Sequence, residues 1–295
     1  MQRIMTLPVL LFALFLAPLC ASQNADYSIQ PVADGLYRVT SGSHHSMYWV
    51  TDDGIVVLDT IDREPALWLK DQLAARHDQP VRYVVYSHNH YDHVYGGEVF
   101  DSPGTVFIAH EAARDDLVRS KAETRIPELT FTDEFALHLG DQELRLRHHG
   151  PNNGLGSVSM HFVDQRVMFV VDWIVIGRMP YQDLPGYDIE GMITSTEEVL
   201  ALAEWDTLVG GHAAIGDRED VQRYLSYLEA LYTAVRDGML EGKSLEQLQQ
   251  NIRLDDFSDL ANYEQWLPLN IAGVYRTLAD QSYMLKRPEV PSGAD

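Results

Sequence analysis

The sequence predicts a mixed α/β domain followed by a helical C-terminal extension. Short apolar runs typical of strands alternate with segments of helical periodicity up to about residue 216, and only helical periodicity follows. No internal repeat, low-complexity segment or clear linker divides the chain. We therefore expect one α/β domain over residues 23–216 and a helical extension over residues 217–295 that packs on the same domain.

Apolar runs bounded by turn residues mark the elements of the first half. Strands are expected over residues 35–39, 47–50, 55–59, 81–86 and 105–109. Asp52-Asp53-Gly54 is a turn signal between two of them. Helices are expected over residues 64–77, where Pro80 lies just beyond the end, and over residues 111–119.

The second half continues this alternation before it becomes helical. Residues 135–139 and 143–147 alternate around Gly140-Asp141 like a hairpin, and further strands are expected over 158–163, 166–171 and 207–209. Helices are expected over 218–241, 244–252 and 263–285. Aromatic and leucine residues recur there at helical spacing and predict either core or the surface of a homodimer: Tyr224, Tyr227, Leu228, Leu231 and Tyr232.

Residues 1–22 are predicted to be a secretory signal peptide. Arg3 precedes an apolar stretch over 7–19, and small residues then provide a cleavage site after Ala21 or Ser22. The apolar stretch is too short to span a membrane comfortably, so no stable span is expected after cleavage. Cys20, the only cysteine, is removed with this segment or lipidated, although Leu19 fits a lipoprotein signal poorly. We expect a periplasmic or secreted protein, since a chain without thiols suits that compartment.

The charge balance restricts the partners. The formal net charge is −22, from 44 acidic and 22 basic residues. Such a surface repels phosphate backbones and anionic headgroups, so nucleic acid and anionic membranes are excluded as partners. A small-molecule substrate is expected instead.

The most informative segment is His88-Asn89-His90-Tyr91-Asp92-His93, where four metal-binding side chains fall within six residues. The segment directly follows the expected strand over 81–86, so it occupies the loop at the C-terminal end of that strand. Imidazole and carboxylate groups suit zinc or a similar cation. A surface loop that happens to be rich in histidine accounts less well for this dense spacing.

Other acids and histidines also stand at the ends of expected strands. Asp59 ends one strand, Asp172 ends another and His212 follows a third after two glycines. Because open α/β sheets place their sites along the carboxyl ends of the strands, we expect these side chains to converge with the histidine-rich loop.

This pattern resembles the metallo-β-lactamase superfamily, whose signature is His-x-His-x-Asp-His after a strand. The likeness covers roughly residues 27–216. It implies a four-layer αββα sandwich with a metal cleft at the sheet edges. It also implies the following roles: His88 and His90 with a third histidine in one site, Asp92, His93 and His212 in a second site, Asp172 bridging the two metals, and Asp59 holding the loop or a ligand histidine by a hydrogen bond.

One position departs from the family pattern. The third histidine of site one is expected after Gly150-Pro151, where this chain has Asn153. An amide oxygen is a weaker zinc ligand than imidazole. Three alternatives stay open: weak binding through Asn153, an empty first site that leaves a one-metal enzyme, or replacement by His148 or His149, which are more simply an exposed polar strand end.

Further residues are candidates for substrate contact. His44 and His45 lie in the predicted loop over 41–46, and Tyr91 is a variable position inside the metal signature. His45 and Tyr91 are our substrate-loop candidates, although a solvated loop and simple packing are the competing interpretations. Arg178 and Tyr181 follow Asp172, where they either line the cleft or have ordinary surface roles.

The expected function is that of a zinc-dependent hydrolase with one or two Zn²⁺ per chain. No nucleophile elbow, phosphate-binding loop or dinucleotide fingerprint is present, so catalysis would depend on metal. Zinc lowers the pKa of bound water to about 7, and the resulting hydroxide would attack the carbonyl of a β-lactam, lactone, ester or thioester. Asp92 would ligate metal and orient the nucleophile.

Two other function classes are weighed against this one. The first is a di-iron redox enzyme on the same fold, against which the weakened site at Asn153 argues. The second is a non-catalytic metal-binding or ligand-binding protein with a decayed site, for which Asn153 is the only support. Metal identity discriminates among the three.

Overall fold

A computed structural model describes residues 27–281. The predicted signal peptide, its cleavage position and Cys20 lie outside the described residues. No helix within residues 27–281 is both long enough and apolar enough to cross a membrane.

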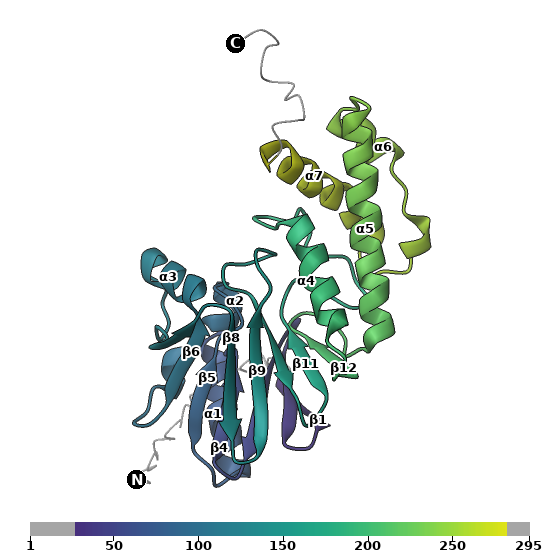
Figure 1. Ribbon diagram of the computed structural model, residues 1–295. Coiled ribbons are helices and arrows are strands. Elements are labelled where there is room, and N and C mark those ends of the chain that lie inside the picture. Colours follow the sequence, from purple (N-terminus) through teal and green to yellow (C-terminus); the bar gives the residue numbers. More distant parts are fainter. Residues whose placement is uncertain (1–26, 282–295) are drawn as a thin grey trace, which may run out of the picture.

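The strands form two sheets (Figure 1). The first has seven strands in chain order: β1 (Tyr27–Ala33), β2 (Leu36–Ser41), β3 (His44–Thr51), β4 (Gly54–Leu58), β5 (Val81–Val85), β6 (Val106–His110) and β7 (Leu129–Phe131). Strands β1 to β4 pair antiparallel, and β4 to β7 pair parallel. Because β4 and β5 run in parallel, Asp59 and the loop from His88 leave the same edge of the sheet.

The second sheet has five strands in the order β12, β11, β10, β9, β8. Their bounds are β8 (Glu134–Leu139), β9 (Gln142–His148), β10 (Val158–Phe162), β11 (Val167–Val170) and β12 (Thr207–Gly210). Strand β12 pairs parallel to β11, whereas the other pairs are antiparallel. Asp172 and His212 therefore follow the carboxyl ends of neighbouring strands.

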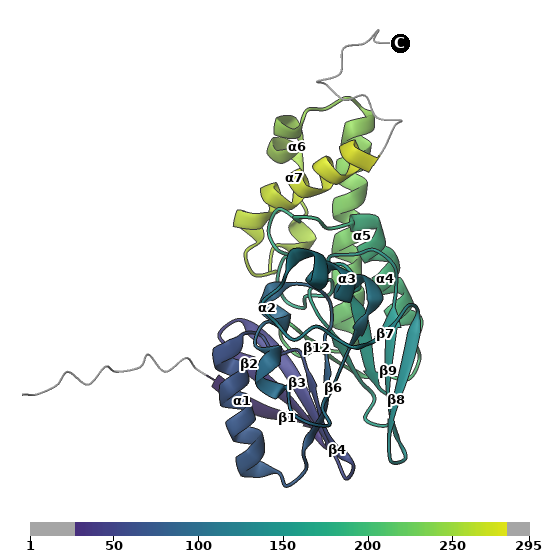
Figure 2. The same cartoon turned by 90° about the vertical axis from the view of Figure 1, so that its left-hand side faces the viewer.

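Alternate residues along each strand face opposite sides of the sheet, and the side that each faces shows how the layers are arranged. In β4, Val56 and Leu58 belong to the apolar cluster between the sheets, whereas Ile55 and Val57 belong to the cluster under the helices. Helices α1 (Arg63–Arg76) and α3 (Glu111–Ser120) cover that outer face, and α4 (Ile189–Ala201) and α5 (Arg218–Leu240) cover the second sheet (Figure 2). The four-layer αββα sandwich is confirmed.

The C-terminal helices share a core with the second sheet. Helices α5, α6 (Leu245–Asn251) and α7 (Tyr263–Gln281) pack with α4 and β11 in one apolar cluster. The aromatic stripe of α5 lies in this core, with Tyr224 and Tyr227 almost fully buried and Tyr232 partly buried. The core interpretation of that stripe is therefore correct, and these buried rings are not a dimer surface.

Several elements were not predicted. Strand β1 was missed because none of its residues is buried, β7 because it is only three residues long, and α4 because it follows a long irregular segment. The short helix α2 (Tyr91–Val94) begins inside the metal signature. The predicted loop over 41–46 shrinks to two residues, since β2 and β3 pair as far as Ser41 and His44.

Candidate metal centre

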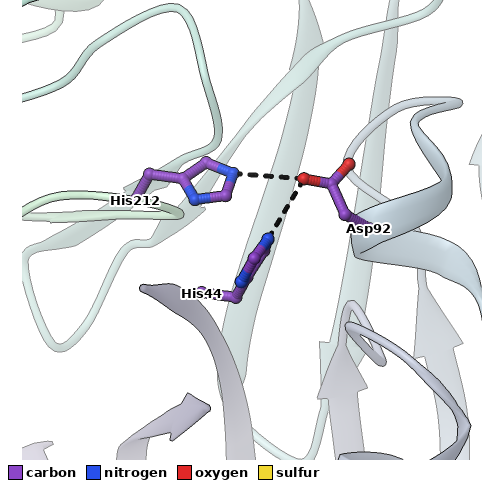
Figure 3. Close-up of side chains that lie close together, drawn as sticks. All are labelled: His44, Asp92 and His212. Carbon is purple, nitrogen blue, oxygen red and sulfur yellow. Dashed lines mark hydrogen bonds and ion pairs between the residues drawn. The ribbon is translucent and has the colours of Figure 1, made fainter. Parts of the chain in front are cut away.

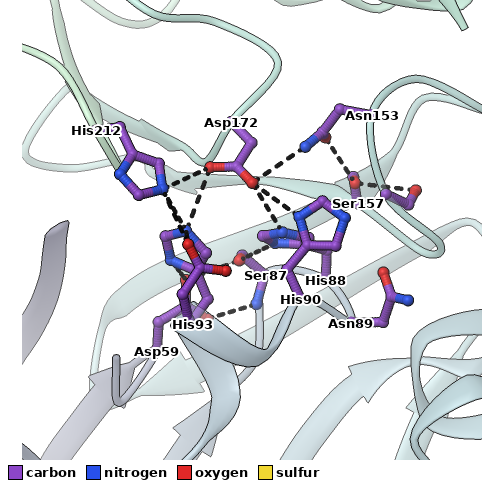
Figure 4. Close-up of polar contacts among 12 residues, drawn as sticks. Asp59, Ser87, His88, Asn89, His90, His93, Asn153, Ser157, Asp172 and His212 are labelled. Atoms are coloured by element: carbon purple, nitrogen blue, oxygen red, sulfur yellow. Dashed lines mark hydrogen bonds and ion pairs between the residues drawn. The ribbon is translucent and has the colours of Figure 1, made fainter. Parts of the chain in front are cut away.

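The strand-end residues meet at one edge of the sandwich. Figure 4 shows Asp172, from the second sheet, facing the histidines that follow β5 in the first sheet. The two oxygens of Asp172 face different partners. Oδ2 lies 3.1 Å from Nε2 of His88 and 3.0 Å from Nδ1 of His90, whereas Oδ1 lies 3.2 Å from Nε2 of both His93 and His212. Asp172 thus stands between the two groups of histidines.

Asp92 completes the second group. Its Oδ2 lies 3.6 Å from Nε2 of His212 and 3.9 Å from Nε2 of His93, and those two nitrogens are 2.9 Å apart. Four ligands about 2.0–2.1 Å from a zinc ion are separated by about 3.3–3.4 Å in a tetrahedron. The donor atoms of Asp92, His93, His212 and Asp172 are thus spaced much as a tetrahedral cation site requires.

Polar groups behind the histidines set the direction of their rings. Asp59 accepts hydrogen bonds from the backbone N–H of Ser87 (2.8 Å) and from its hydroxyl (2.7 Å), and its Oδ2 lies 3.6 Å from Nδ1 of His93. The Ser87 hydroxyl also contacts Nδ1 of His88 at 2.7 Å, and the carbonyl of Ser43 lies 3.1 Å from Nδ1 of His212. In each case Nε2 is left facing the cluster. Asp59 therefore hydrogen-bonds to the loop at Ser87 and lies beside the ring of His93.

The backbone at two of the acids is strained. Asp59 has φ 60° and Asp172 has φ 71°, values in the left-handed region that non-glycine residues rarely adopt. Such strain persists only where surrounding structure over-determines the conformation, and it concentrates at functional sites. The Asp172 carboxylate faces into the cluster, and the Asp59 carboxylate faces Ser87 and His93 from behind it.

The charges of the cluster are strongly coupled. Burial opposes ionisation of both Asp172 and His93. The neighbouring His93 and His88 nevertheless hold the pKa of Asp172 well below its usual range, and Asp172 with Asp59 raises the pKa of His93 well above 6.5. Burial, with His90 beside it, lowers the pKa of His88 to about 4. Asp172 therefore stays ionised, and a cation bound here would displace the proton that Asp172 and Asp59 stabilise on His93.

Asn153 faces this cluster with its nitrogen. The Asn153 side chain is buried, its Nδ2 donates to Oδ2 of Asp172 at 3.1 Å, and its Oδ1 accepts from the Ser157 hydroxyl at 3.2 Å. A hydrogen-bond network of this kind assigns the oxygen away from the histidines. In this arrangement Asn153 is a hydrogen-bond donor to Asp172.

Neither upstream histidine replaces the missing ligand. His149 is buried between Oε2 of Glu198 and the Ser159 hydroxyl, each at 2.8 Å. His148 contacts the carbonyl of Ser157, and its ring packs 4.0 Å from that of His110. In this structure neither of them lies in the cluster, because each contacts partners elsewhere.

An open cavity of about 550 Å³ lies over the cluster. Its lining residues come from the metal signature, the segment after β11 and helix α7: Ser43, His44, His90, Tyr91, Asp92, Asp172, Arg178, Tyr181, Pro185, Tyr187, His212 and Trp266. Tyr91 is 70% exposed at its rim. Arg178 and Tyr181 line the cleft, which is the functional one of the two roles weighed for them.

His45 is not part of that lining. It alternates with His44 along β3, and its Nδ1 lies 3.1 Å from the Thr40 hydroxyl. The substrate-loop prediction for His45 is therefore corrected in favour of His44. The adjacent pair His44-His45 indicated in the sequence that a histidine lies at the cleft. Only the strand register decides which of the two faces it. Tyr187 and Trp266 carried no signal in the sequence.

The match to a family model decides the relationship of the chain. A model described as the metallo-beta-lactamase superfamily matches residues 40–212. The chain belongs to the metallo-beta-lactamase superfamily. Among curated proteins, the alpha subunit of a 2,4-dinitroanisole O-demethylase from Nocardioides sp. (strain JS1661) is 22% identical over 238 residues, which cover 79% of this chain and 69% of that protein.

Solved structures of metallo-beta-lactamases share the fold. The metallo-beta-lactamase from Pontibacter korlensis aligns with a TM-score of 0.62 at 19% identity, over 69% of this chain and 99% of that one. The DIM-1 metallo-beta-lactamase aligns with a TM-score of 0.61 at 16% identity, over 69% and 97% of the two chains. At these identities the likeness concerns the fold alone.

The residues of this superfamily member fit a metal ion. Nε2 of His88 and Oδ1 of Asp172 are buried and point into the cluster, but their close contacts within residues 27–281 lack hydrogen-bond geometry. Unsatisfied buried polar atoms are costly, and a cation would satisfy both. In the part of the chain that the structure describes, two groups of three side chains have ligand atoms within 4.8 Å of one another: His88, His93 and Asp172, and His44, Asp92 and His212.

Proposed function

We propose that this protein is a metal-dependent hydrolase that uses zinc to cleave a carbonyl-type substrate. The observation that carries the proposal is the spacing of donor atoms from Asp92, His93, His212 and Asp172 at the floor of an open cavity. A bound cation would supply an acidified water and a Lewis acid for the scissile oxygen. Imidazole with carboxylate favours zinc over a hard cation, and iron is the competing metal.

The side chains of this protein would position water and move its proton. Burial raises the pKa of Asp92, but hydrogen bonds from His212 and His44 outweigh burial and hold that pKa below its usual range. Asp92 therefore stays ionised at neutral pH, and its carboxylate can accept a hydrogen bond from a water on the cavity floor. Burial raises the pKa of Tyr187, so its phenol stays protonated and can donate to a substrate oxygen.

The cavity wall supports a substrate with an anionic group and an aromatic ring. The guanidinium of Arg178 packs 5.5 Å from the ring of Trp266, and its Nε is buried without a hydrogen-bond partner in the described part of the chain. Tyr181 packs edge-on against the same indole at 5.7 Å. A carboxylate or phenolate would pair with Arg178, and the aromatic side chains would stack on a ring.

The O-demethylase relative adds one specific substrate to test. That protein is named for removing a methyl group from 2,4-dinitroanisole, an aromatic ether. The aromatic cleft wall of this chain is compatible with such a ligand, so we include aryl ether cleavage as a second candidate reaction. Export to the periplasm or the medium also stays part of the proposal, as predicted from residues 1–22.

The test is a substrate panel with a matched variant. The protein is stripped of metal, reloaded separately with zinc and iron, and assayed on a β-lactam, a lactone, an aryl ester, a thioester and 2,4-dinitroanisole. We expect zinc to support turnover of at least one carbonyl substrate. The Asp92→Ala variant should lose about 100-fold or more of that activity because it lacks the group that orients water.

The control for that variant is its thermal unfolding midpoint in the metal-free state, which should match that of the parent protein. Equal activity of parent and variant would contradict the role of Asp92. Failure to bind any metal would contradict the whole proposal. Turnover that requires iron and oxygen would favour the redox alternative.

A further inference from the structure

His44 lies beside the metal cluster although the family signature does not include it. Its Nε2 lies 3.3 Å from Oδ2 of Asp92, and Nε2 of His212 lies 3.6 Å from the same oxygen. Figure 3 shows both rings directed at that carboxylate from different elements, His44 from the start of β3 and His212 from the loop after β12. The three ligand atoms lie within 4.8 Å of one another.

The backbone fixes this arrangement. The N–H of His45 donates to the carbonyl of Gly211 at 2.7 Å, and the carbonyl of Ser43 lies 3.1 Å from Nδ1 of His212. These contacts join the start of β3 to the loop that carries His212, on both sides of His44. The two imidazoles pack edge-to-face with their centres 4.7 Å apart. His44 is therefore held beside His212 by contacts that do not depend on its own side chain.

The same three residues are accessible from the cavity. The side chains of His44 and Asp92 are 32% and 28% exposed, whereas those of His88 and His93 are fully buried. All three line the cavity over the cluster. A cation at this position would meet both solvent and substrate, unlike one held only by the buried histidines.

We propose that His44 is an additional direct ligand, beside His93 and Asp172, of the cation that Asp92 and His212 would hold. Imidazoles and carboxylates are a donor set that zinc and other first-row metals accept. The site lies on the side of Asp172 away from Asn153, which presents an amide nitrogen. His44 would thus be a third imidazole ligand, with His93 and His212, on one side of Asp172. The other side offers only the two imidazoles of His88 and His90. The inference rests on the metal binding proposed above.

The chain provides a matched control for this residue. His45 is adjacent, is also a histidine, and is bound to Thr40 instead of Asp92. His44→Ala and His45→Ala therefore remove the same group from neighbouring positions, one inside the proposed site and one outside it. Metal-free unfolding midpoints of both variants would verify that each one folds.

The first measurement is titration of the metal-free full chain with Co²⁺, followed by visible absorption and counted by elemental mass spectrometry. The expected result is that His44→Ala weakens binding of one Co²⁺ about 10-fold or more, while His45→Ala matches the parent. Superimposable isotherms for the two variants would overturn the proposal.

The second measurement separates a ligand from a hydrogen-bond partner, because losing either weakens binding. Proton NMR of the Co²⁺-loaded parent should contain one set of strongly shifted imidazole resonances that is missing from His44→Ala and retained in His45→Ala. An affinity loss without the loss of such a set would overturn direct ligation. Absence of Co²⁺ binding by the parent protein would overturn the proposed function as well, whereas normal binding by all three proteins would overturn only the role of His44.

Discussion

Asp172 links the two groups of histidines, and the Asn153 amide lies beside it on the side of His88 and His90. The Asn153 amide neutralises part of the charge on Oδ2 of Asp172 by a hydrogen bond, but it brings no lone pair toward His88 and His90. On the opposite side, Oδ1 of Asp172 faces His93 and His212, with Asp92 beyond them. The side of Asp172 that faces His93, His212 and Asp92 therefore offers more donor atoms than the side that faces His88 and His90.

Replacing Asn153 with histidine should strengthen metal binding on the weaker side. The Asn153→His variant places an imidazole next to His88 and His90, and a neighbouring cavity of about 400 Å³, lined by Asn153 and His90, provides room for the larger ring. We expect zinc affinity on this side to rise about 10-fold or more, measured by equilibrium dialysis and elemental mass spectrometry.

Asn153→Leu is the control for that change, since it removes the amide without adding a ligand atom. If both variants hold the same amount of zinc as the parent, with the same affinity, then position 153 does not face the cation. The alignment of Asn153 with the family histidine would then be wrong.

At the scale of elements, the C-terminal helices build one wall of the cavity over the metal-binding candidates. Helix α7 contributes Trp266 directly, and its Asn270 donates to the carbonyls of Pro180 (3.2 Å) and Gln182 (2.7 Å) in the segment after β11. The Tyr227 hydroxyl of α5 donates to Oδ1 of the same Asn270 at 2.7 Å. The extension therefore holds the segment that carries Arg178 in place over the metal cluster.

This arrangement predicts that the Arg178 wall of the cavity binds anionic ligands more tightly than neutral ones. Arg178→Gln should weaken binding of benzoate about 10-fold or more and leave benzamide unchanged, because a hydrogen bond to a charged group contributes roughly 1.5–3 kcal/mol. Ligand-observed NMR with the metal-loaded protein measures both affinities.

Arg82→Gln is a suitable control because Arg82 is an exposed arginine on β5, away from the cavity lining. A parallel loss for benzoate and benzamide would show that Arg178 supports the wall and does not recognise charge. Equal benzoate binding by Arg178→Gln and the parent would rule out an anion contact at this position.

At the scale of the whole molecule, two sheets bury a shared core and direct their strand ends to one edge. The inter-sheet cluster contains residues of both sheets, such as Trp49 and Phe162, which pack edge-to-face with ring centres 5.5 Å apart. Because the candidate metal ligands follow strands of both sheets, global stability and the geometry of this cluster depend on the same packing. We therefore expect the titration of buried groups far from this cluster to change the free energy of unfolding.

His161 on β10 is such a group. It is 3% exposed, and burial lowers its pKa despite a contact with the carbonyl of Glu204 at 3.1 Å. The unfolded chain takes up a proton at this position below about pH 6.5, whereas the folded chain does so only at lower pH. The contribution of this group to stability is therefore present above pH 6.5 and decreases as pH falls below 6.5.

The check is urea unfolding of the metal-free protein at pH 7.5 and 5.5. The His161→Gln variant should lose less stability between these pH values than the parent. The other histidines, whether folding raises or lowers their pKa, contribute equally to the two proteins. The difference in stability loss therefore reports on His161 alone. Identical losses would mean that His161 is protonated equally in the folded and unfolded states.

The sequence by itself determined the class of the fold and most of the residues of the centre. Strand and helix periodicity placed β4, β5, β11 and β12, and the polar residues directly after these strands marked the edge at which they meet. Local propensity suffices for this because apolar strands and their terminal turns are properties of short segments. The family signature then implied the ligand roles of His88, His90, Asp92 and His93, which follow β5 as one continuous loop.

Only the tertiary structure decided which of two adjacent histidines meets the cluster and which aromatic residues wall the cavity. His44 faces Asp92 and His45 does not because of strand register, which depends on pairing with distant residues. Trp266 reaches the cavity because helix α7 packs on the segment after β11, nearly a hundred residues earlier in the chain. The direction of the Asn153 amide likewise depends on Asp172 and Ser157, which lie close to it only once both loops are folded. These features depend on contacts between segments, so no local pattern in the sequence could specify them.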